Sequence, residues 1–122
     1  MGHTRAKVTF SNPSSSKTEE MELFVDTGST FTWVSKLLLE RLEVRPQTEW
    51  TFKTIDGRVL KRRVGEAVVS CLGESATTKV VFAEEGDANV LGVYALEGLM
   101  LEVDPATEQL RKTGALLAIR TL

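Results

Sequence analysis

The residues best suited to do chemistry in this chain are Asp26, Thr27 and Gly28, which directly follow the apolar residues 23–25. The apolar run predicts a buried strand that ends at the acid. Burial raises the free-energy cost of ionising a carboxyl group, which suits that group to acid–base chemistry. Gly28 permits a tight turn, and the hydroxyls of Thr27 and Ser29 could hold the carboxylate. Asp and Gly are also ordinary turn residues, so a plain turn at a strand end is the alternative.

The chain offers few other groups for catalysis or metal binding, because it has one histidine, His3, and one cysteine, Cys71. His3 lies among the first residues, so we expect neither a Ser-His-Asp nor a Cys-His catalytic site, and no His/Cys cluster for zinc. Cys71 lies in a strand-like run and is expected to be a buried, unreactive thiol without a disulfide partner. We therefore expect no metal and no cofactor, and carboxylates must carry any catalysis.

Length and composition predict one soluble domain that spans residues 1–122. Apolar residues make up 42% of the chain and charged residues 26%, and the net charge is −2. This balance gives no electrostatic sign of nucleic-acid binding, and the basic run 61–63 is interpreted as the solvated face of a strand. No apolar run approaches the ~20 residues of a membrane helix, and no signal peptide opens the chain. We therefore expect no membrane partner and a cytoplasmic location.

Short apolar or alternating runs, separated by Gly, Pro, Asp and Asn, predict a mostly β fold. The dipeptides Asp56-Gly57 and Gly73-Glu74 each predict a hairpin turn. The predicted strands cover residues 7–10, 21–25, 31–34, 50–55, 58–64, 65–72, 77–82, 90–91 and 115–119.

Two short helices are also predicted, the second over residues 94–100. Ser35 is expected to cap the first helix, which runs to Arg41. A weak internal repeat accompanies them, because Leu23–Gly28 and Asn89–Gly92 both lead from an apolar strand through a glycine towards a helix. Three leucines of the first helix are expected to face inward: Leu37, Leu38 and Leu42.

Four landmarks stand in the order found in one known family. They are Phe24–Gly28, the hairpin 53–59 with its continuation into 64–67, Val90-Leu91-Gly92, and the segments 96–99 and 101–105 taken together. Together they resemble the retropepsin-type aspartic proteases, in particular the single-domain members of cellular organisms. The resemblance covers roughly residues 18–110.

The chain differs from other members of that family at three places, the first two of which are departures from the viral members. Val93-Tyr94 follow the second glycine, where viral members carry an arginine that supports the dimer interface. The hairpin has one glycine, Gly57, in place of a glycine-rich tip. Ser29 is the residue of the pepsin-like version of the motif, where many small members have alanine. The first two departures bear on viral-style dimer contacts and on movement of the hairpin.

The resemblance implies a retropepsin-like closed barrel or sandwich, mostly β, with one or two short helices, a flap hairpin and a two-fold homodimer. The residues Phe24, Val25 and Leu91 are expected to pack in the core. The terminal strands 7–10 and 115–119 are candidates for pairing across the dimer interface, because edge strands need covering.

The same resemblance implies an aspartic endopeptidase in which each subunit donates one Asp26. Two carboxyl groups a few ångströms apart cannot both ionise, so they share a proton. The ionised group takes a proton from a water molecule that attacks the peptide carbonyl, and the protonated group donates to the carbonyl oxygen.

Supporting roles are implied for residues on either side of the substrate, which is expected to be an extended peptide or an unfolded protein bound as a strand. Thr27 bonds across the dimer, Gly28 keeps the floor of the cleft open, and Ser29 hydrogen-bonds Asp26. A flap closes over the peptide and excludes water. Its residues are Ile55, Asp56 and Gly57.

Two other functions remain as alternatives. A retropepsin-fold domain could bind peptides or dimerise without cutting them. An unrelated small β-barrel could bind a ligand, with Asp26-Thr27-Gly28 as a coincidence.

Overall fold

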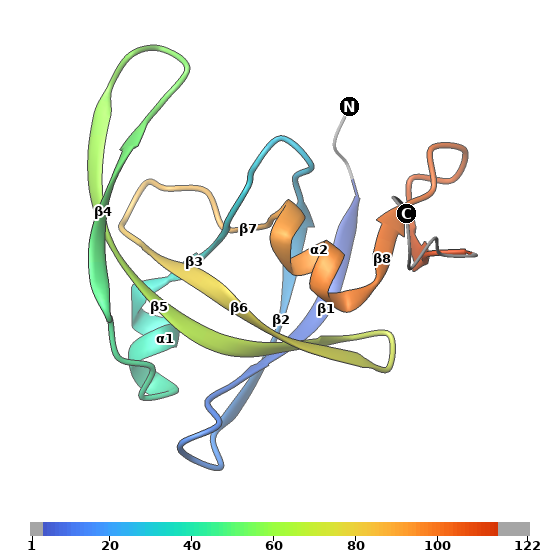
Figure 1. The fold of residues 1–122 in the computed structure, drawn as a ribbon, viewed down its shortest axis with the longest axis horizontal. Coiled ribbons are helices and arrows are strands. Elements are labelled where there is room, and N and C mark those ends of the chain that lie inside the picture. Colours follow the sequence, from blue (N-terminus) through green and yellow to red (C-terminus); the bar gives the residue numbers. More distant parts are fainter. Residues whose placement is uncertain (1–3, 115–122) are drawn as a thin grey trace, which may run out of the picture.

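The computed structural model describes residues 4–114, which form nine strands and two short helices (Figure 1). The fold is mostly β, as the sequence predicts. In chain order the elements are β1 (Arg5–Ser11), β2 (Thr18–Val25), β3 (Thr32–Ser35), α1 (Lys36–Arg41), β4 (Thr48–Lys53), β5 (Val59–Cys71), β6 (Glu74–Ala83), β7 (Val90–Leu91), α2 (Val93–Leu99), β8 (Leu101–Val103) and β9 (Leu110–Lys112).

Seven of these strands form one sheet in the order β1-β2-β7-β3-β6-β5-β4, and β1 also pairs with β5. The pairings therefore run from β1 round to β5 and back to β1, and β4 is attached outside this circuit. The short β7 lies parallel to β2 and antiparallel to β3, with Val25 opposite Leu91. This arrangement brings the end of β2 next to the end of β7, although Asp26 and Gly92 are 66 positions apart along the chain.

The core lies inside this circuit of strands and is closed by the two helices. Alternate residues of β1 point inward, as the period of a strand requires, and Phe10 is fully buried. Leu39 of α1 and Leu99 of α2 cover the ends of the core. Cys71 is buried, as predicted, and burial raises the pKa of its thiol.

The inward face predicted for the first helix is wrong in part. Leu37 is 61% exposed, whereas Leu39 is fully buried. The helix has only six residues, so its orientation follows from the end of β3 and not from its own apolar pattern. Ser35 precedes the helix, but its side chain makes no capping hydrogen bond.

Two turns differ from the prediction for reasons of backbone geometry. Residues 59–71 form one strand without a break at Gly65, where a Cβ atom would lie 2.7 Å from the carbonyl oxygen of Arg45. Gly65 thus permits a close approach of two segments and does not end a strand. The second hairpin turns at Leu72-Gly73, one residue earlier than predicted, with φ values of 50° and 83°.

The prediction that Phe24 packs in the core is wrong, since this residue is 44% exposed. Val25 and Leu91 are buried as predicted, so the alternation of β2 turns Phe24 outward, where the guanidinium of Arg5 lies 4.6 Å from its ring centroid. Neither described helix is long and apolar enough to cross a membrane.

Two terminal strands are predicted to pair across a dimer interface, and the structure describes only the first of them. Within the predicted strand 7–10, Thr9 and Phe10 pair with β2 on one side and β5 on the other, so this part is not a free edge. The predicted strand 115–119 lies outside the described residues.

Candidate active site

Asp26 stands at the carboxyl end of β2, and the backbone on both sides of it is fixed. The Asp26 N–H donates to the carbonyl oxygen of Leu91 in β7 at 3.0 Å. One residue earlier, the Val25 N–H donates to the carbonyl oxygen of Thr4 at 2.9 Å. The position of the acid therefore depends on two segments distant in sequence, which explains why strand pairing is needed to place it.

The turn that follows is closed by its own backbone. The Gly28 N–H donates to Oδ1 of Asp26 at 2.9 Å, and the Ser29 N–H donates to the Asp26 carbonyl oxygen at 3.1 Å. A Cβ atom on Gly28 would lie 3.2 Å from Oδ1, so glycine leaves this carboxylate oxygen room. The carboxyl group is held in one orientation as a result.

Two sequence-based expectations about this turn are wrong for the single chain. Asp26 is exposed and not buried. The Ser29 hydroxyl donates to the carbonyl oxygen of Phe31 at 2.7 Å and not to the Asp26 carboxylate. Thr27 is exposed beside the acid. The exposed carboxyl and hydroxyl both face away from the core of their own chain.

Gly92 packs directly against the backbone of the loop 26–31. A Cβ atom there would lie 2.3 Å from the carbonyl oxygen of Phe31 and 2.8 Å from that of Ser29, so only glycine allows this contact. The two residues that follow it donate backbone N–H groups to the loop, Val93 to Ser29 at 2.8 Å and Tyr94 to the Thr30 carbonyl oxygen at 3.1 Å.

Thr32 is a supporting residue that the sequence did not single out. Its side chain is buried, and its Oγ1 accepts the Gly92 N–H at 2.9 Å. A hydroxyl at a position that should be apolar in a short buried strand was the only signal in the sequence. The loop, β7 and the start of α2 therefore form one hydrogen-bonded unit around Asp26.

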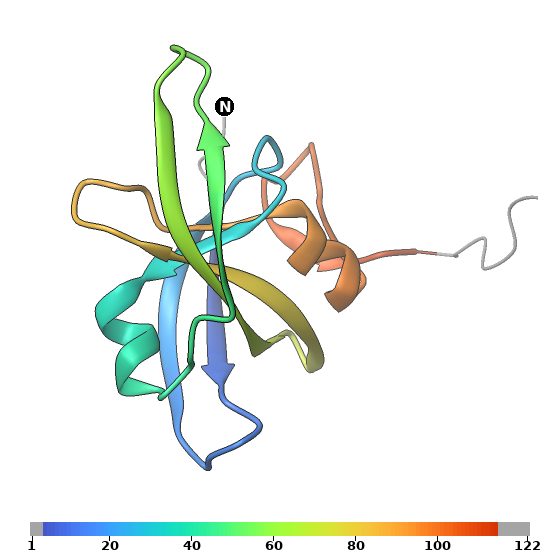
Figure 2. The ribbon, with the colours of Figure 1, turned by 60° about the vertical axis from the view of Figure 1, so that its left-hand side comes forward.

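The hairpin of β4 and β5 rises away from the rest of the molecule on the side where this loop lies (Figures 1 and 2). Its outer part, defined as residues 48–63, is called the arm below. At the tip, Ile55 is fully exposed and Gly57 has φ of 88°. Hydrogen bonds from Thr54 and Arg58 hold the carboxyl of Asp56 and lower its pKa.

Five aromatic side chains fill the space between the arm and the loop, and they are called the aromatic cluster below. Phe31, at the end of the loop, has its ring centroid 5.1 Å from that of Trp50 in the arm and 5.4 Å from that of Tyr94. Trp33 and Phe52 complete the cluster at 5.0 Å from one another. Such tilted ring pairs are favourable beyond the area they bury, so the cluster links the arm to the Asp26 loop.

A family model for aspartyl proteases matches residues 6–95 of the 122. The chain belongs to the aspartyl protease family. The family predicted from the four landmarks is thereby confirmed. No curated protein matches the chain at a significant level.

In this aspartyl protease chain the sequence-predicted site residues fall into two groups. Asp26, Thr27, Gly28 and Ser29 share one loop. The second group, Ile55, Asp56 and Gly57, lies at the tip of the arm, and the aromatic cluster lies between the bases of the two segments. The first group offers an exposed carboxyl group in a fixed orientation. The second group can contribute to the same site only if the arm extends over the Asp26 loop.

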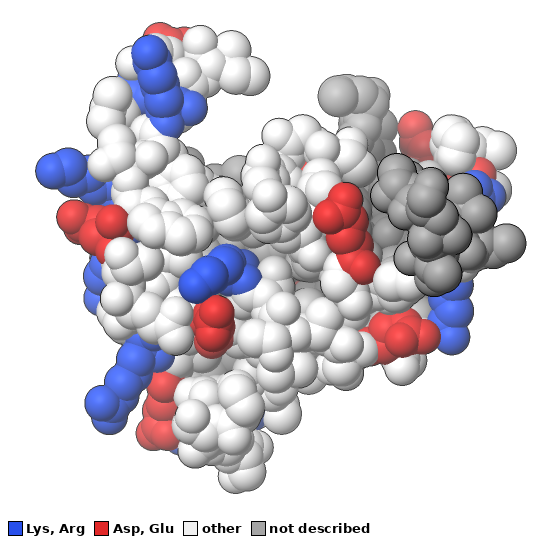
Figure 3. Space-filling view, viewed as in Figure 1, with Lys and Arg blue, Asp and Glu red and all other residues white. Residues whose placement is uncertain are grey.

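The electrostatics of the aspartyl protease chain give no large patch of a single sign on the face drawn in Figure 3, where basic and acidic side chains alternate around the arm and the body. Among residues 4–114, no group of three or more His, Cys, Asp or Glu side chains is arranged to hold a metal ion.

Proposed function

We propose that the chain is one half of a homodimeric aspartic endopeptidase in which each subunit contributes Asp26. The observation that carries this proposal is an exposed carboxyl group held in one orientation by the Gly28 N–H, in a chain of the aspartyl protease family with one Asp-Thr-Gly sequence. Hydrolysis by this mechanism needs two carboxyl groups, and one chain supplies only Asp26. A second copy of the chain, related by a two-fold axis beside the loop, supplies the other carboxyl group without any further kind of subunit.

In the proposed site the two Asp26 carboxyl groups share one proton. The ionised group removes a proton from a water molecule, and that water attacks the carbonyl carbon of the peptide bond. The protonated group donates its proton to the carbonyl oxygen, which gives a neutral tetrahedral intermediate. Proton transfer to the amide nitrogen then breaks the C–N bond. Because the Gly28 N–H occupies Oδ1, it fixes the direction in which the carboxyl group faces the water.

Other parts of the chain have roles in the proposed dimer. The circuit of strand pairings supports the proposal of a retropepsin-like barrel, and the arm is the proposed flap. An extended peptide would lie between the Asp26 loop and the tip of the arm, with Ile55 above it. Thr27 is exposed beside Asp26, where it is available for a bond to the partner subunit.

The deciding experiment compares wild type with Asp26→Asn on a mixture of unfolded proteins from about pH 3 to 7, the range in which coupled carboxyl groups act. We expect the variant to stay folded and dimeric and to lose activity by about 10²–10⁴-fold or more. Glu20→Gln is the matched control, since it makes the same carboxyl-to-amide change at an exposed position of β2. Cleavage by Asp26→Asn at the wild-type rate would remove Asp26 from the mechanism.

Mixing the two proteins tests the shared site directly. If each active centre needs two Asp26 side chains, activity falls with the square of the wild-type fraction once subunits exchange. A linear fall, or a monomer by sedimentation under assay conditions, would contradict a site shared between subunits. A stable dimer that cleaves nothing would favour a non-catalytic peptide-binding module.

A further inference from the structure

The arm leaves the main sheet at Val64, and its position depends on few contacts. The pairing of β5 with β6 begins at Val64, so Val59–Arg63 pairs with β4 alone. An isolated two-stranded ribbon is marginally stable in water and has no preferred direction relative to a body it does not touch. The side-chain contacts of the arm with the body therefore decide where the arm stands. On the outer face these come from Arg63 at the base of the arm, whose guanidinium group lies 3.5 Å from the Glu40 carboxylate and 5.0 Å from the ring centroid of Phe82, and the remaining contacts lie on the inner face.

Cross-strand pairs identify this inner face. Trp50 lies opposite Arg62, and Phe52 lies opposite Leu60, so these side chains share one side of the ribbon. All four are half-buried, whereas Lys61, on the other side, is exposed. The inner face therefore has two attachments to the body: the aromatic cluster, through Trp50 and Phe52, and the contact made by Arg62.

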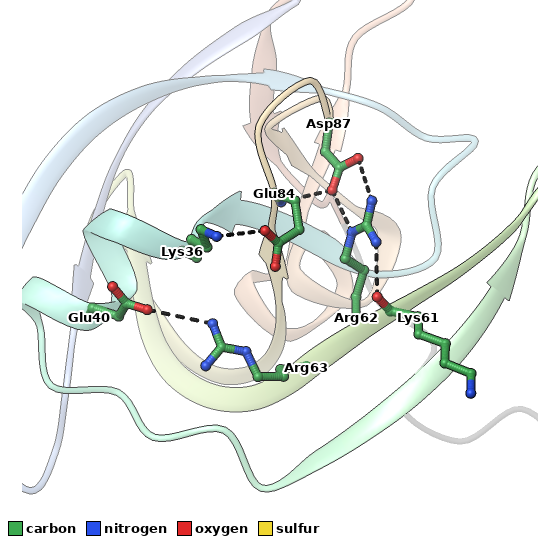
Figure 4. A network of polar contacts seen from close by, with 7 residues as sticks. All are labelled: Lys36, Glu40, Lys61, Arg62, Arg63, Glu84 and Asp87. Carbon is green, nitrogen blue, oxygen red and sulfur yellow. Dashed lines mark hydrogen bonds and ion pairs between the residues drawn. The ribbon is translucent and has the colours of Figure 1, made fainter.

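Arg62 forms a two-point ion pair with Asp87, in the loop between β6 and β7 (Figure 4). Its Nε lies 2.7 Å from Oδ2 and its Nη2 lies 3.0 Å from Oδ1. The side chains are only 15% and 13% exposed, so solvent screens this pair much less than a surface pair. A planar guanidinium bound at two points also fixes orientation, which a single contact does not.

The loop that receives Arg62 is itself fixed. Oδ2 of Asp87 also accepts the Glu84 N–H at 2.8 Å, and the Glu84 carboxylate lies 2.6 Å from Nζ of Lys36 at the start of α1. The loop then leads into β7, whose Leu91 carbonyl oxygen holds the Asp26 N–H. A short covalent path thus connects the carboxylate that holds the arm to the backbone that holds the candidate catalytic acid.

We propose that the Arg62–Asp87 pair sets the position of the arm relative to the Asp26 loop, which makes Arg62 a positioning residue for peptide binding. The aromatic cluster holds the same face but is built of ring contacts that can slide. The ion pair supplies the direction. The part of this proposal that concerns peptide binding rests on the proposed endopeptidase function, whereas the part that concerns the arm does not.

Hydrogen–deuterium exchange of the whole chain tests the mechanical part without any need for activity. In Arg62→Gln we expect the amides of β4 and of residues 59–63 to exchange roughly tenfold to hundredfold faster, the loss expected for hydrogen bonds to a charged group. Exchange in β1 and β2 should stay at the wild-type rate. Lys61→Gln, the same kind of change on the exposed side of the same strand, should leave the arm unchanged. Arg62→Lys should lie between wild type and Arg62→Gln, because it keeps the charge but loses the two-point geometry.

Peptide cleavage supplies the second readout. We expect Arg62→Gln to raise KM about threefold or more while kcat changes by less than about twofold, because substrate binds to the positioned arm while the acid itself is untouched. Unchanged exchange in the arm, or faster exchange spread evenly over all strands, would overturn the proposal. Faster exchange in the arm with an unchanged KM would overturn its link to peptide binding. Because exchange needs no substrate, an inactive wild-type protein would refute the proposed function and leave the arm result intact.

Discussion

The Asp26 loop and the tip of the arm are both turns next to a glycine, yet they are held in opposite ways. Loop 26–31 is bound from outside itself, by backbone groups of Leu91, Val93 and Tyr94. Among residues 4–114, the hydrogen bonds of the tip all run within Thr54–Arg58. In the proposed endopeptidase, the loop fixed by distant strands would hold the acid still, and the tip, which keeps its own shape, would cover a long substrate.

The glycine that contacts the Asp26 loop and the glycine in the tip are required for different reasons. Gly92 is required because another backbone occupies the place of a side chain, with Phe31 O only 2.3 Å from an added Cβ. Gly57 has nothing within 4 Å of an added Cβ, and its requirement comes from its φ of +88° alone. Replacing Gly92 by alanine therefore tests close packing against the Asp26 loop, whereas replacing Gly57 by alanine tests local backbone strain.

The largest expected effect is that of Gly92→Ala. The added methyl group must displace the carbonyl groups of Ser29 and Phe31, so we expect the free energy of unfolding to fall by about 3 kcal/mol or more, measured by urea titration. Activity should fall with it, because the same carbonyl groups belong to the Asp26 loop. Gly114→Ala is the control, since nothing lies within 4 Å of its added Cβ. Wild-type stability in Gly92→Ala would show that the loop can move away, against the view of a fixed loop.

Gly57→Ala should have a much smaller effect on stability, about 1 kcal/mol, because it strains only an exposed turn. If the tip acts as a cover, KM for a peptide should change while kcat changes less. The comparison is Gly73→Ala, at a hairpin turn with φ of +83° and equally open surroundings. It should cost similar stability and leave KM unchanged. Equal KM values for the two variants would contradict the role of the tip as a cover.

The smallest expected effect is on the acid dependence of stability, and it concerns the attachment of the arm. The hydrogen bond from Arg62 lowers the pKa of Asp87, with further help from the Glu84 N–H. A carboxyl whose folded pKa is lowered stabilises the fold above its unfolded pKa of about 3.9, and this contribution is lost as the pH falls through the folded value. Lys36, Glu84, Arg63 and Arg58 are the other charged groups near this pair.

Urea titrations from about pH 4 to pH 2 should therefore show a shallower loss of stability in Arg62→Gln than in wild type. The difference in proton uptake between the two proteins should stay below about one proton per chain, because one carboxyl is responsible. Lys61→Gln should follow the wild-type slope. Identical slopes for Arg62→Gln and wild type would mean that the pair does not shift the Asp87 titration in solution.

Local sequence signals were sufficient wherever structure depends on neighbours in the chain. The apolar run before Asp26 and the pair Val90-Leu91 became strands, and Asp56-Gly57 lies in a hairpin tip. Prediction was wrong where a distant segment decides. Leu37 is exposed because β3 orients its short helix. Gly65 lies inside a strand, where the absence of a side chain leaves room for the backbone of Arg45.

The candidate site divides in the same way. The sequence by itself determined the family, the one Asp-Thr-Gly loop that can carry an acid, and the lack of a histidine-based alternative, because these depend on which residues are present and in what order. Only the tertiary structure decided that Leu91, Thr32 and Gly92 hold the loop, that the Ser29 hydroxyl bonds Phe31, and that Arg62 meets Asp87. Apart from the Ser29–Phe31 bond, which lies within the loop, these contacts join segments far apart in the chain. The pairing of strands brings those segments together, and strand register is a property of the assembled sheet and of no single segment.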